Sequence, residues 1–94
     1  MAKLKLRLYD TANYLKTDED IAAYLDAIFE DGDPALIAHG LGVVARSKGM
    51  AKVAKKAGLG RESLYKALSK DGNPGFMTVL KVVQALGYKL KLAA

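Results

Sequence analysis

Cysteine is absent from this chain of 94 residues, which also has only two prolines and a single histidine. Without cysteine the chain has no disulfide bonds, thiolate metal sites or cysteine nucleophiles, and its composition is compatible with a reducing compartment. The few prolines allow long helices over most of the length. The lone histidine, His39, is expected to be an ordinary packed or surface side chain. We therefore expect a protein that is not an enzyme and has no cofactor and no metal.

Long apolar runs are also missing. No run approaches the roughly 20 residues that a membrane-spanning helix needs. Residues 1–8 alternate charged and apolar side chains and contain no apolar core of a signal peptide. A hydrophobic content of 51% with 27% charged residues is typical of a globular chain. We expect one soluble cytoplasmic domain, residues 1–94, without a membrane partner.

Positive charge is concentrated in one part of the sequence. The net charge is +5, yet residues 1–30 carry six acidic residues against four basic ones. Residues 46–70 carry eight basic residues against Glu62 alone. Such a concentration is expected of a protein that binds a polyanion such as nucleic acid. A solvated lysine-rich face is the alternative interpretation.

Helix-type spacing of apolar residues predicts five helices. Thr17 and the carboxylates after it are typical of a helix start, and that helix should end near Gly32. Asp33 and Pro34 should begin the second helix, which ends near Gly49. The remaining helices are expected over 50–57, from 61 to about 70, and from 76 to Gly87. The buried faces expected for the first, second and fifth helices are Ile21, Tyr24, Leu25, Ile28 and Phe29; Leu36, Ile37, Leu41, Val44 and Ala45; and Phe76, Val79, Leu80, Val83 and Leu86.

Both ends of the chain alternate lysine or arginine with leucine. Residues 3–8 and 88–92 therefore read as short strand candidates with one apolar face. The N-terminal strand either adds to the edge of a partner's sheet or pairs with Leu90 and Leu92 of the same or a twofold-related chain. We favour a homodimer that involves the C-terminal strand.

Residues 50–68 have the pattern of two helices that cross through a tight turn. Ala54 supplies a small side chain where the helices touch, and Gly58 can adopt the positive φ that the turn needs. Val53, Leu59, Leu64 and Ala67 are the apolar residues that would lock the second helix onto the first. A helical hairpin packed for structural reasons alone is the alternative to a DNA-binding helix-turn-helix.

Burial of Leu64 and Ala67 would turn the opposite face of the second helix outward. A helix of this kind lies in the major groove of DNA with its N-terminal residues closest to the bases. Tyr65 could either contact a phosphate or base, or pack against the fifth helix. The DNA-binding residues that we predict are Lys48, Lys52, Gly60, Arg61, Glu62, Ser63, Tyr65, Lys66, Ser69 and Lys70.

The segments 53–54, 58–59, 63–68, 72–74 and 85–87 together resemble the lambda-repressor-like (Xre-type) helix-turn-helix domains. A closer resemblance, over nearly the whole chain, is to the addiction-module antidote proteins. It is carried by Tyr9-Asp10, Tyr14-Leu15, Ala23-Tyr24-Leu25, Gly32-Asp33-Pro34, residues 46–50 and residues 61–69. Met50 departs from the lambda-type pattern, which has glutamine at the start of this helix. A base or phosphate contact borrowed for that position is therefore in doubt, and Lys48 or Lys52 could contact the DNA backbone instead.

The resemblance implies a mainly α, lambda-repressor-like domain, to which the spacing of apolar residues adds the expectation of five helices and of short strand candidates at both termini. It also implies an antitoxin that represses its own operon by binding double-stranded operator DNA and neutralises a small basic toxin of the RelE/ParE superfold. The organisation we expect is an N-terminal extension over 1–33, a DNA-binding core over 34–87 and a C-terminal strand over 88–94. The acidic first 30 residues suit a basic toxin, and the alternative interpretation is that residues 18–20 only cap a helix; both can hold at once. The toxin-binding residues that we predict are Leu4, Leu6, Leu8, Tyr9, Asp10, Tyr14 and Leu15.

Two other functions remain open from the sequence. The chain could be a free-standing helix-turn-helix repressor without a toxin partner, or an interaction module whose helix-turn-helix no longer binds DNA. The acidic N-terminal extension favours the antitoxin over the first, and the retained Arg61 and Lys66 argue against the second.

Overall fold

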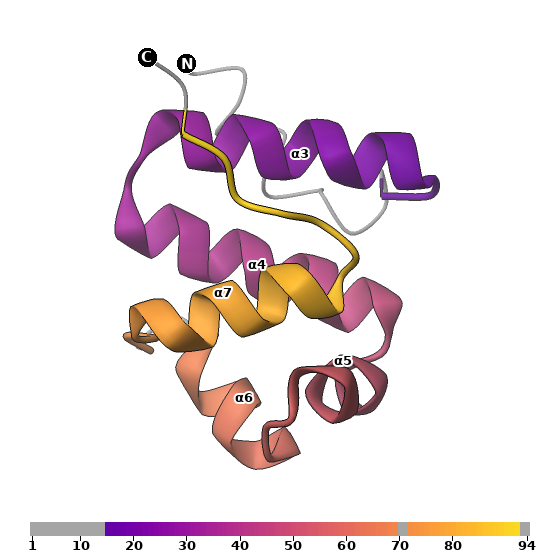
Figure 1. Ribbon diagram of the computed structural model, residues 1–94, viewed down its shortest axis with the longest axis vertical. Coiled ribbons are helices and arrows are strands. Elements are labelled where there is room, and N and C mark those ends of the chain that lie inside the picture. Colours follow the sequence, from indigo (N-terminus) through magenta and orange to yellow (C-terminus); the bar gives the residue numbers. More distant parts are fainter. Residues whose placement is uncertain (1–14, 70–71, 93–94) are drawn as a thin grey trace.

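The structure is a computed structural model, and it describes residues 15–69 and 72–92 of the chain. This described part is mainly helical (Figure 1), and it contains five helices and no strand. The helices are α3 (Asp18–Asp31), α4 (Pro34–Lys48), α5 (Met50–Ala57), α6 (Arg61–Ala67) and α7 (Phe76–Ala85). The five helices expected between residues 17 and 87 are thus confirmed in their order and approximate positions within the described residues.

Side-chain caps fix the start of α3 and of α4. The Asp20 backbone N–H donates to the Thr17 hydroxyl at 3.1 Å, and the Thr17 N–H donates to the Asp20 carboxylate at 3.2 Å. These two bonds form a reciprocal capping box, which satisfies amides that have no partner inside the helix. The Asp33 carboxylate accepts from the Ala35 N–H at 3.0 Å, and Pro34 occupies the first turn of α4.

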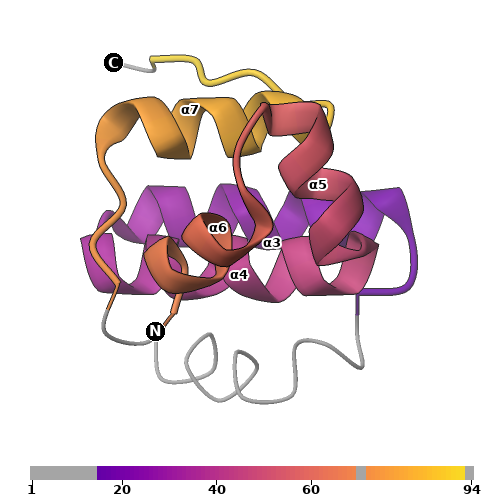
Figure 2. The same ribbon diagram turned by 90° about the horizontal axis from the view of Figure 1, so that it is seen from below.

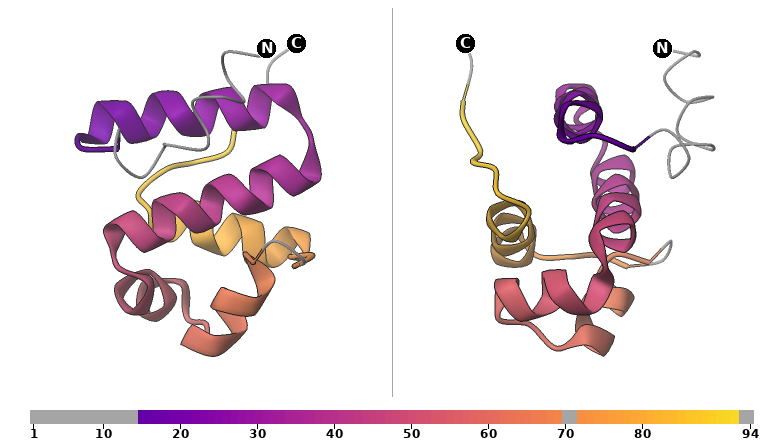
Figure 3. Two further views of the ribbon diagram at one scale, coloured as in Figure 1. Left: turned by 180° about the vertical axis from the view of Figure 1, so that it is seen from behind. Right: turned by 90° about the vertical axis from the view of Figure 1, so that its right-hand side faces the viewer.

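The helices stack around one apolar core. α3 packs on α4, α7 packs on α4 and α5, and α5 and α6 pack on each other at the end of the molecule opposite α3 (Figures 1 and 3). The largest fully buried side chains come from four of the helices and the residue after α6; they are Ile28, Leu41, Val44, Leu64, Leu68 and Val82. This core holds α5 and α6 at a fixed position relative to the rest of the chain.

The buried face of α7 differs from the prediction. Phe76 is 69% exposed, whereas Val82, which the prediction left out, is completely buried. Val79 and Leu86 are partly buried against the core, and Val83 is buried as expected. Helical periodicity shows that α7 has an apolar face, but it does not show which part of that face packs against other helices. Here α4 and α5 cover the part that carries Val82.

The fourth helix is shorter than expected and ends at Ala67. The Ser69 hydroxyl donates to the Lys66 carbonyl at 2.8 Å and the Ser69 N–H donates to the same oxygen, which closes the last turn. A side-chain hydroxyl that bonds locally to the backbone competes with continuation of a helix.

The predicted C-terminal strand is not formed over residues 88–92. The Tyr88 N–H still bonds to the Val83 carbonyl at the end of α7, and the segment then crosses toward α3 without a strand partner in the described part of the chain (Figure 1). Alternation of apolar and charged residues gives a segment one apolar face. A strand also needs a neighbouring backbone with which to form its ladder of hydrogen bonds. The predicted strand over residues 3–8 lies outside the described residues.

No helix in residues 15–69 and 72–92 is both long enough and apolar enough to cross a membrane.

Candidate nucleic-acid interface

A three-residue turn joins α5 to α6. Gly58 has a backbone φ of +71°, a value that residues with a Cβ rarely adopt. Its N–H donates to the Lys55 carbonyl at 3.2 Å. The Leu59 N–H donates to the Ala54 carbonyl at 2.9 Å. Gly60 then begins α6, since its carbonyl accepts from the Leu64 N–H at 2.9 Å. The glycine predicted to make the turn does so.

Small and apolar side chains hold the two helices together. Val53 and Ala54 of α5 are 3% and 2% exposed, and Leu64 of α6 is fully buried. Leu59 in the turn is partly buried against the same cluster, and Leu68 continues it after α6. Packing on this side leaves the other side of α6 without a covering helix.

The outward surface of α5 and α6 lies on one side of the molecule, as Figure 2 shows from below. Apart from Lys48, the predicted DNA-binding residues that the structure describes gather on these two helices and the residues bordering them. All of these are exposed: Lys52, Gly60, Arg61, Glu62, Ser63, Tyr65, Lys66 and Ser69. Lys70 lies outside the described residues.

The side chains of Arg61 and Tyr65 form a cation–π contact on this surface. The Arg61 guanidinium carbon lies 5.5 Å from the centre of the Tyr65 ring, one helical turn away. Contacts of this kind are worth about 0.5–1 kcal/mol at exposed sites, and they restrict the arginine side chain. Tyr65 is 41% exposed and is not part of the core cluster, so packing into the core is not its role in this chain.

The side chain of Lys48 forms its ion pair with α3 and not with α5 or α6. Its ammonium group is 3.0 Å from the Asp18 carboxylate at the start of α3. The Tyr88 hydroxyl donates to the Asp18 carbonyl at 3.3 Å, so α3, α4 and the C-terminal segment meet there. The exposed fractions of the Lys48 and Asp18 side chains are 37% and 85%, and an exposed pair of this kind contributes at most about 1 kcal/mol.

Met50, the residue that replaces the expected glutamine, is only 4% exposed and belongs to the core. The first residue of α5 therefore has no side chain available for a surface contact. Lys52, two residues later, is exposed and offers a cation near the start of the same helix.

Of the predicted toxin-binding residues, Leu15 is within the described part of the chain. Its side chain is 8% exposed and packs in the core cluster. The other six lie outside the described residues, namely Leu4, Leu6, Leu8, Tyr9, Asp10 and Tyr14.

The sequence-based site left out two lysines. Lys55 and Lys56 lie in the last turn of α5, before Ala57 and Gly58, and both are exposed. They contribute to the positive charge counted over residues 46–70, and their place beside the turn follows from the helix end that Gly58 marks. They add two exposed cations at the end of α5, where Lys56 lines a hollow with Lys81 and Gln84 of α7.

Comparison with known proteins identifies a family and a relative that are similar to this chain in sequence. The sequence profile of a family described as "probable addiction module antidote protein" matches residues 5–94. The chain is also similar to an uncharacterized protein of Haemophilus influenzae (strain ATCC 51907 / DSM 11121 / KW20 / Rd). The two are 42% identical over 88 residues, which cover 94% of this chain and 91% of that protein. No solved structure matches the chain.

Proposed function

The chain belongs to the family of probable addiction module antidote proteins, and from this we propose an antitoxin that also binds operator DNA and represses its own operon. The family implies a toxin as partner and a regulatory protein that acts by binding, not by catalysis. The DNA-binding part of the proposal goes beyond the family description. It depends on the α5–α6 pair and on the charge around it.

The observation that carries the DNA-binding role is the exposed face of α6. Leu64 is fully buried, and Arg61, Glu62, Tyr65 and Lys66 project from the other side. A recognition helix needs this arrangement, because one face must be anchored while the other enters the major groove. The positive charge of residues 46–70 supports phosphate binding around it. A lambda-repressor-like arrangement of α4 to α7 is part of the same proposal.

A gel-shift titration with the DNA upstream of the chain's own gene tests this role. We expect the wild type to prefer that DNA to random sequence, and its affinity to fall steeply between about 50 and about 200 mM salt. The Arg61→Ala, Lys66→Ala double variant should lose the preference. A matched control is the Lys16→Ala, Lys81→Ala double variant. It also removes two positive charges, but outside α5 and α6, and it should retain the preference for the upstream DNA. Equal affinity of the wild type for both DNAs would refute operator binding.

The toxin-binding role is proposed for the N-terminal extension over residues 1–33. Its acidic residues include Glu19 and Glu30, which are exposed on α3 and complement a basic partner. Family membership supports a toxin as partner, and a small basic RelE/ParE-like protein is the partner class that we propose. Leu4, Leu6 and Leu8 would add a strand to the edge of its sheet.

Co-purification with the product of the adjacent reading frame tests the toxin site. The alternation of residues 3–8 provides a matched pair of variants on opposite faces of the same segment. We expect Leu4→Ser, Leu6→Ser to abolish co-purification, and Lys3→Ser, Lys5→Ser to leave the partner bound. Both variants should still bind DNA. If the lysine variant alone lost the toxin, the leucine face would not be the contact.

A free-standing repressor is the second candidate. The exposed α6 face would serve it equally well, so DNA binding does not distinguish it from an antitoxin. The distinguishing result would be a chain that binds its operator, while no adjacent reading frame encodes a protein that it binds.

A further inference from the structure

Large apolar side chains are exposed on the side of the molecule that carries α7 and the C-terminal segment. Phe76 is 69% exposed, Leu90 is 38% exposed, and Leu92 is completely exposed. A single exposed apolar residue is ordinary, but a contiguous group with a charged rim marks an interaction surface.

These side chains line one groove. Residues of α3 form one wall, residues 88–92 form the other, and Phe76 and Val83 of α7 lie between them. The groove has a volume of about 650 Å³, and through Phe29, Phe76 and Leu90 it continues into a second hollow beside α4. Its centre is apolar and open to solvent.

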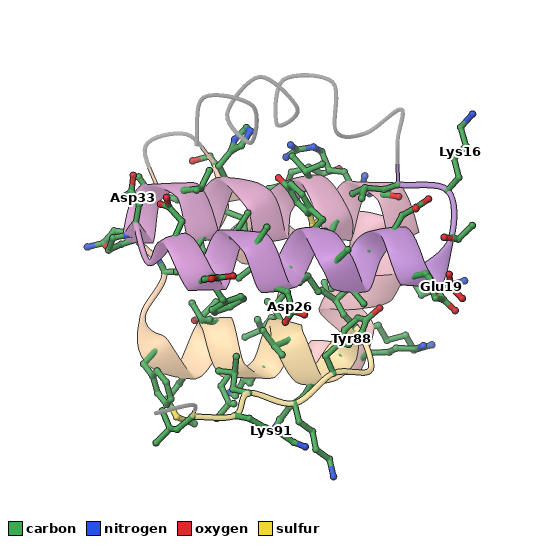
Figure 4. The ribbon with its side chains drawn as sticks, turned by 90° about the horizontal axis from the view of Figure 1, so that it is seen from above. Lys16, Glu19, Asp26, Asp33, Tyr88 and Lys91 are labelled. Atoms are coloured by element: carbon green, nitrogen blue, oxygen red, sulfur yellow. The ribbon has the colours of Figure 1, made fainter. Side chains whose placement is uncertain are left out.

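The two walls of the groove carry opposite charge. Asp26 lines the α3 wall, and Lys89 and Lys91 line the C-terminal wall. Figure 4 shows Glu19 and Asp26 on the side of α3 toward Tyr88, while Lys91 points outward from the molecule. In the described part of the chain, no carboxylate lies within ion-pair distance of Lys89 or Lys91. Both lysines are therefore available to an external acidic surface.

This charge arrangement selects among possible occupants. A twofold rotation places the lysine wall of one copy against the acidic wall of another, with apolar side chains between them, so the groove is complementary to itself. A basic protein would meet two unpaired lysines, and DNA would meet an apolar surface with an acidic wall. A second copy of this chain fits both the charge and the apolar centre.

The backbone beside the groove is also unpaired. Beyond the Tyr88 N–H, residues 89–92 form no backbone hydrogen bond within the described part of the chain. An extended segment with free N–H and C=O groups pairs readily with another chain. We propose that this groove is a homodimer interface, in which Phe76, Leu90 and Leu92 of each copy pack against the same surface of the other.

The groove lies beside the DNA-facing end of the molecule and not on it. Figure 3 shows α7 and the C-terminal segment on one flank, with α5 and α6 at the end. A twofold axis along that flank leaves both α6 helices facing the same way. The use of this dimer on operator DNA rests on the proposed function, whereas the dimer itself can be measured without DNA.

The test is sedimentation equilibrium of the full chain alone, without toxin or DNA. We expect the wild type at micromolar concentration to have twice the 10.1 kDa mass of the monomer. Phe76→Lys should give the monomer mass, with the dimer weakened about 100-fold or more, because both copies lose a buried ring. Met77→Lys is the matched control: Met77 is 60% exposed on the same helical turn but does not line the groove, and its variant should remain a dimer.

Three further single variants and one combination test whether the loss of the dimer is caused by the interface itself and not by unfolding, and whether the charges of the two walls contribute. Leu92 makes no buried contact, so Leu92→Lys should weaken the dimer with an unchanged thermal melting curve. Asp26→Lys and Lys91→Glu should each weaken it, and their combination in one chain should restore it. A monomeric wild type, or a Phe76→Lys variant that stays dimeric, would overturn the interface. So would a Phe76→Lys variant that loses the toxin while keeping the dimer mass, since the groove would then bind toxin.

Discussion

Gly40 and Gly42 lie two residues apart on α4 and face different neighbours. A Cβ at Gly40 would lie 2.5 Å from the tip of the Ile28 side chain, and a Cβ at Gly42 would lie 2.8 Å from the Leu68 carbonyl oxygen. The first glycine allows α3 to approach α4, and the second allows the end of α6 to do so. A side-chain tip can rotate away, but a backbone oxygen at a helix end moves only with the helix.

Gly42→Ala should therefore destabilise the fold even though alanine favours helix. Overpacking costs about 1–3 kcal/mol and helix propensity returns at most about 1, so we expect the free energy of unfolding to fall by about 1–2 kcal/mol. Urea denaturation of the two proteins measures this. Ser47→Ala, at an exposed position of the same helix, serves as control and should not destabilise. If Gly42→Ala were as stable as the control, α6 would not approach α4 this closely.

Arg61 and Lys66 should contribute to operator binding in different ways. Arg61 lies at the start of α6, where side chains reach base edges, so Arg61→Ala should cost about 1–3 kcal/mol and relax sequence preference. Lys66 lies a turn later, and its loss should weaken binding to all sequences similarly and reduce the salt slope by about 1. Gel shifts on operator and scrambled DNA across a salt series distinguish the two. Equal losses of preference in both variants would contradict this division.

At the scale of the elements, short-range signals in the sequence predicted the helix starts and the turns. Thr17 with Asp20, Asp33 with Pro34, and Gly58 each act through bonds within a few residues, and the structure has each of them where expected. The α5–α6 pair was predictable for the same reason, because its spacing and its turn glycine are local.

The features that were not predictable depend on distant neighbours. The exposure of Phe76 and the burial of Val82 depend on which side of α7 meets α4 and α5. The pairing of Lys48 with Asp18 joins residues 30 positions apart, and no local pattern indicates it. The segment over residues 88–92 has the alternation of a strand, but a ladder requires a partner that the single chain does not supply among the described residues.

The capping box of α3 gives a prediction at this scale. Thr17→Ala removes the acceptor for the Asp20 N–H and should lower the free energy of unfolding by about 1 kcal/mol. For a chain of this size the melting temperature should fall by about 4–8 °C. Thr17→Ser keeps the hydroxyl and should retain most of the stability. Equal melting temperatures for the alanine and serine variants would show that the cap contributes nothing.

For the whole molecule, the arrangement sets the positions of three proposed surfaces. α5 and α6 lie at one end and α3 lies toward the other (Figures 1 and 3), and the apolar groove runs between α3 and residues 88–92. The proposed toxin-binding extension includes α3, which also supplies one wall of the groove, so the proposed toxin and dimer surfaces adjoin each other. Because α5 and α6 do not line the groove, loss of the proposed dimer contact need not remove the proposed DNA-binding surface.

Dimerisation through the groove makes a prediction for the operator. Two α6 helices fixed on one side of a dimer should protect two DNA segments about 10 base pairs apart on the same face of the duplex. Hydroxyl-radical footprinting of the wild type measures this spacing. Phe76→Lys leaves α6 intact but removes the linkage between the two copies, so full protection should need a concentration about 100-fold higher or more. Met77→Lys should give the wild-type footprint at the wild-type concentration. Half-sites two turns apart, or equal protection by both variants, would mean that the dimer bound to DNA is not formed through the groove.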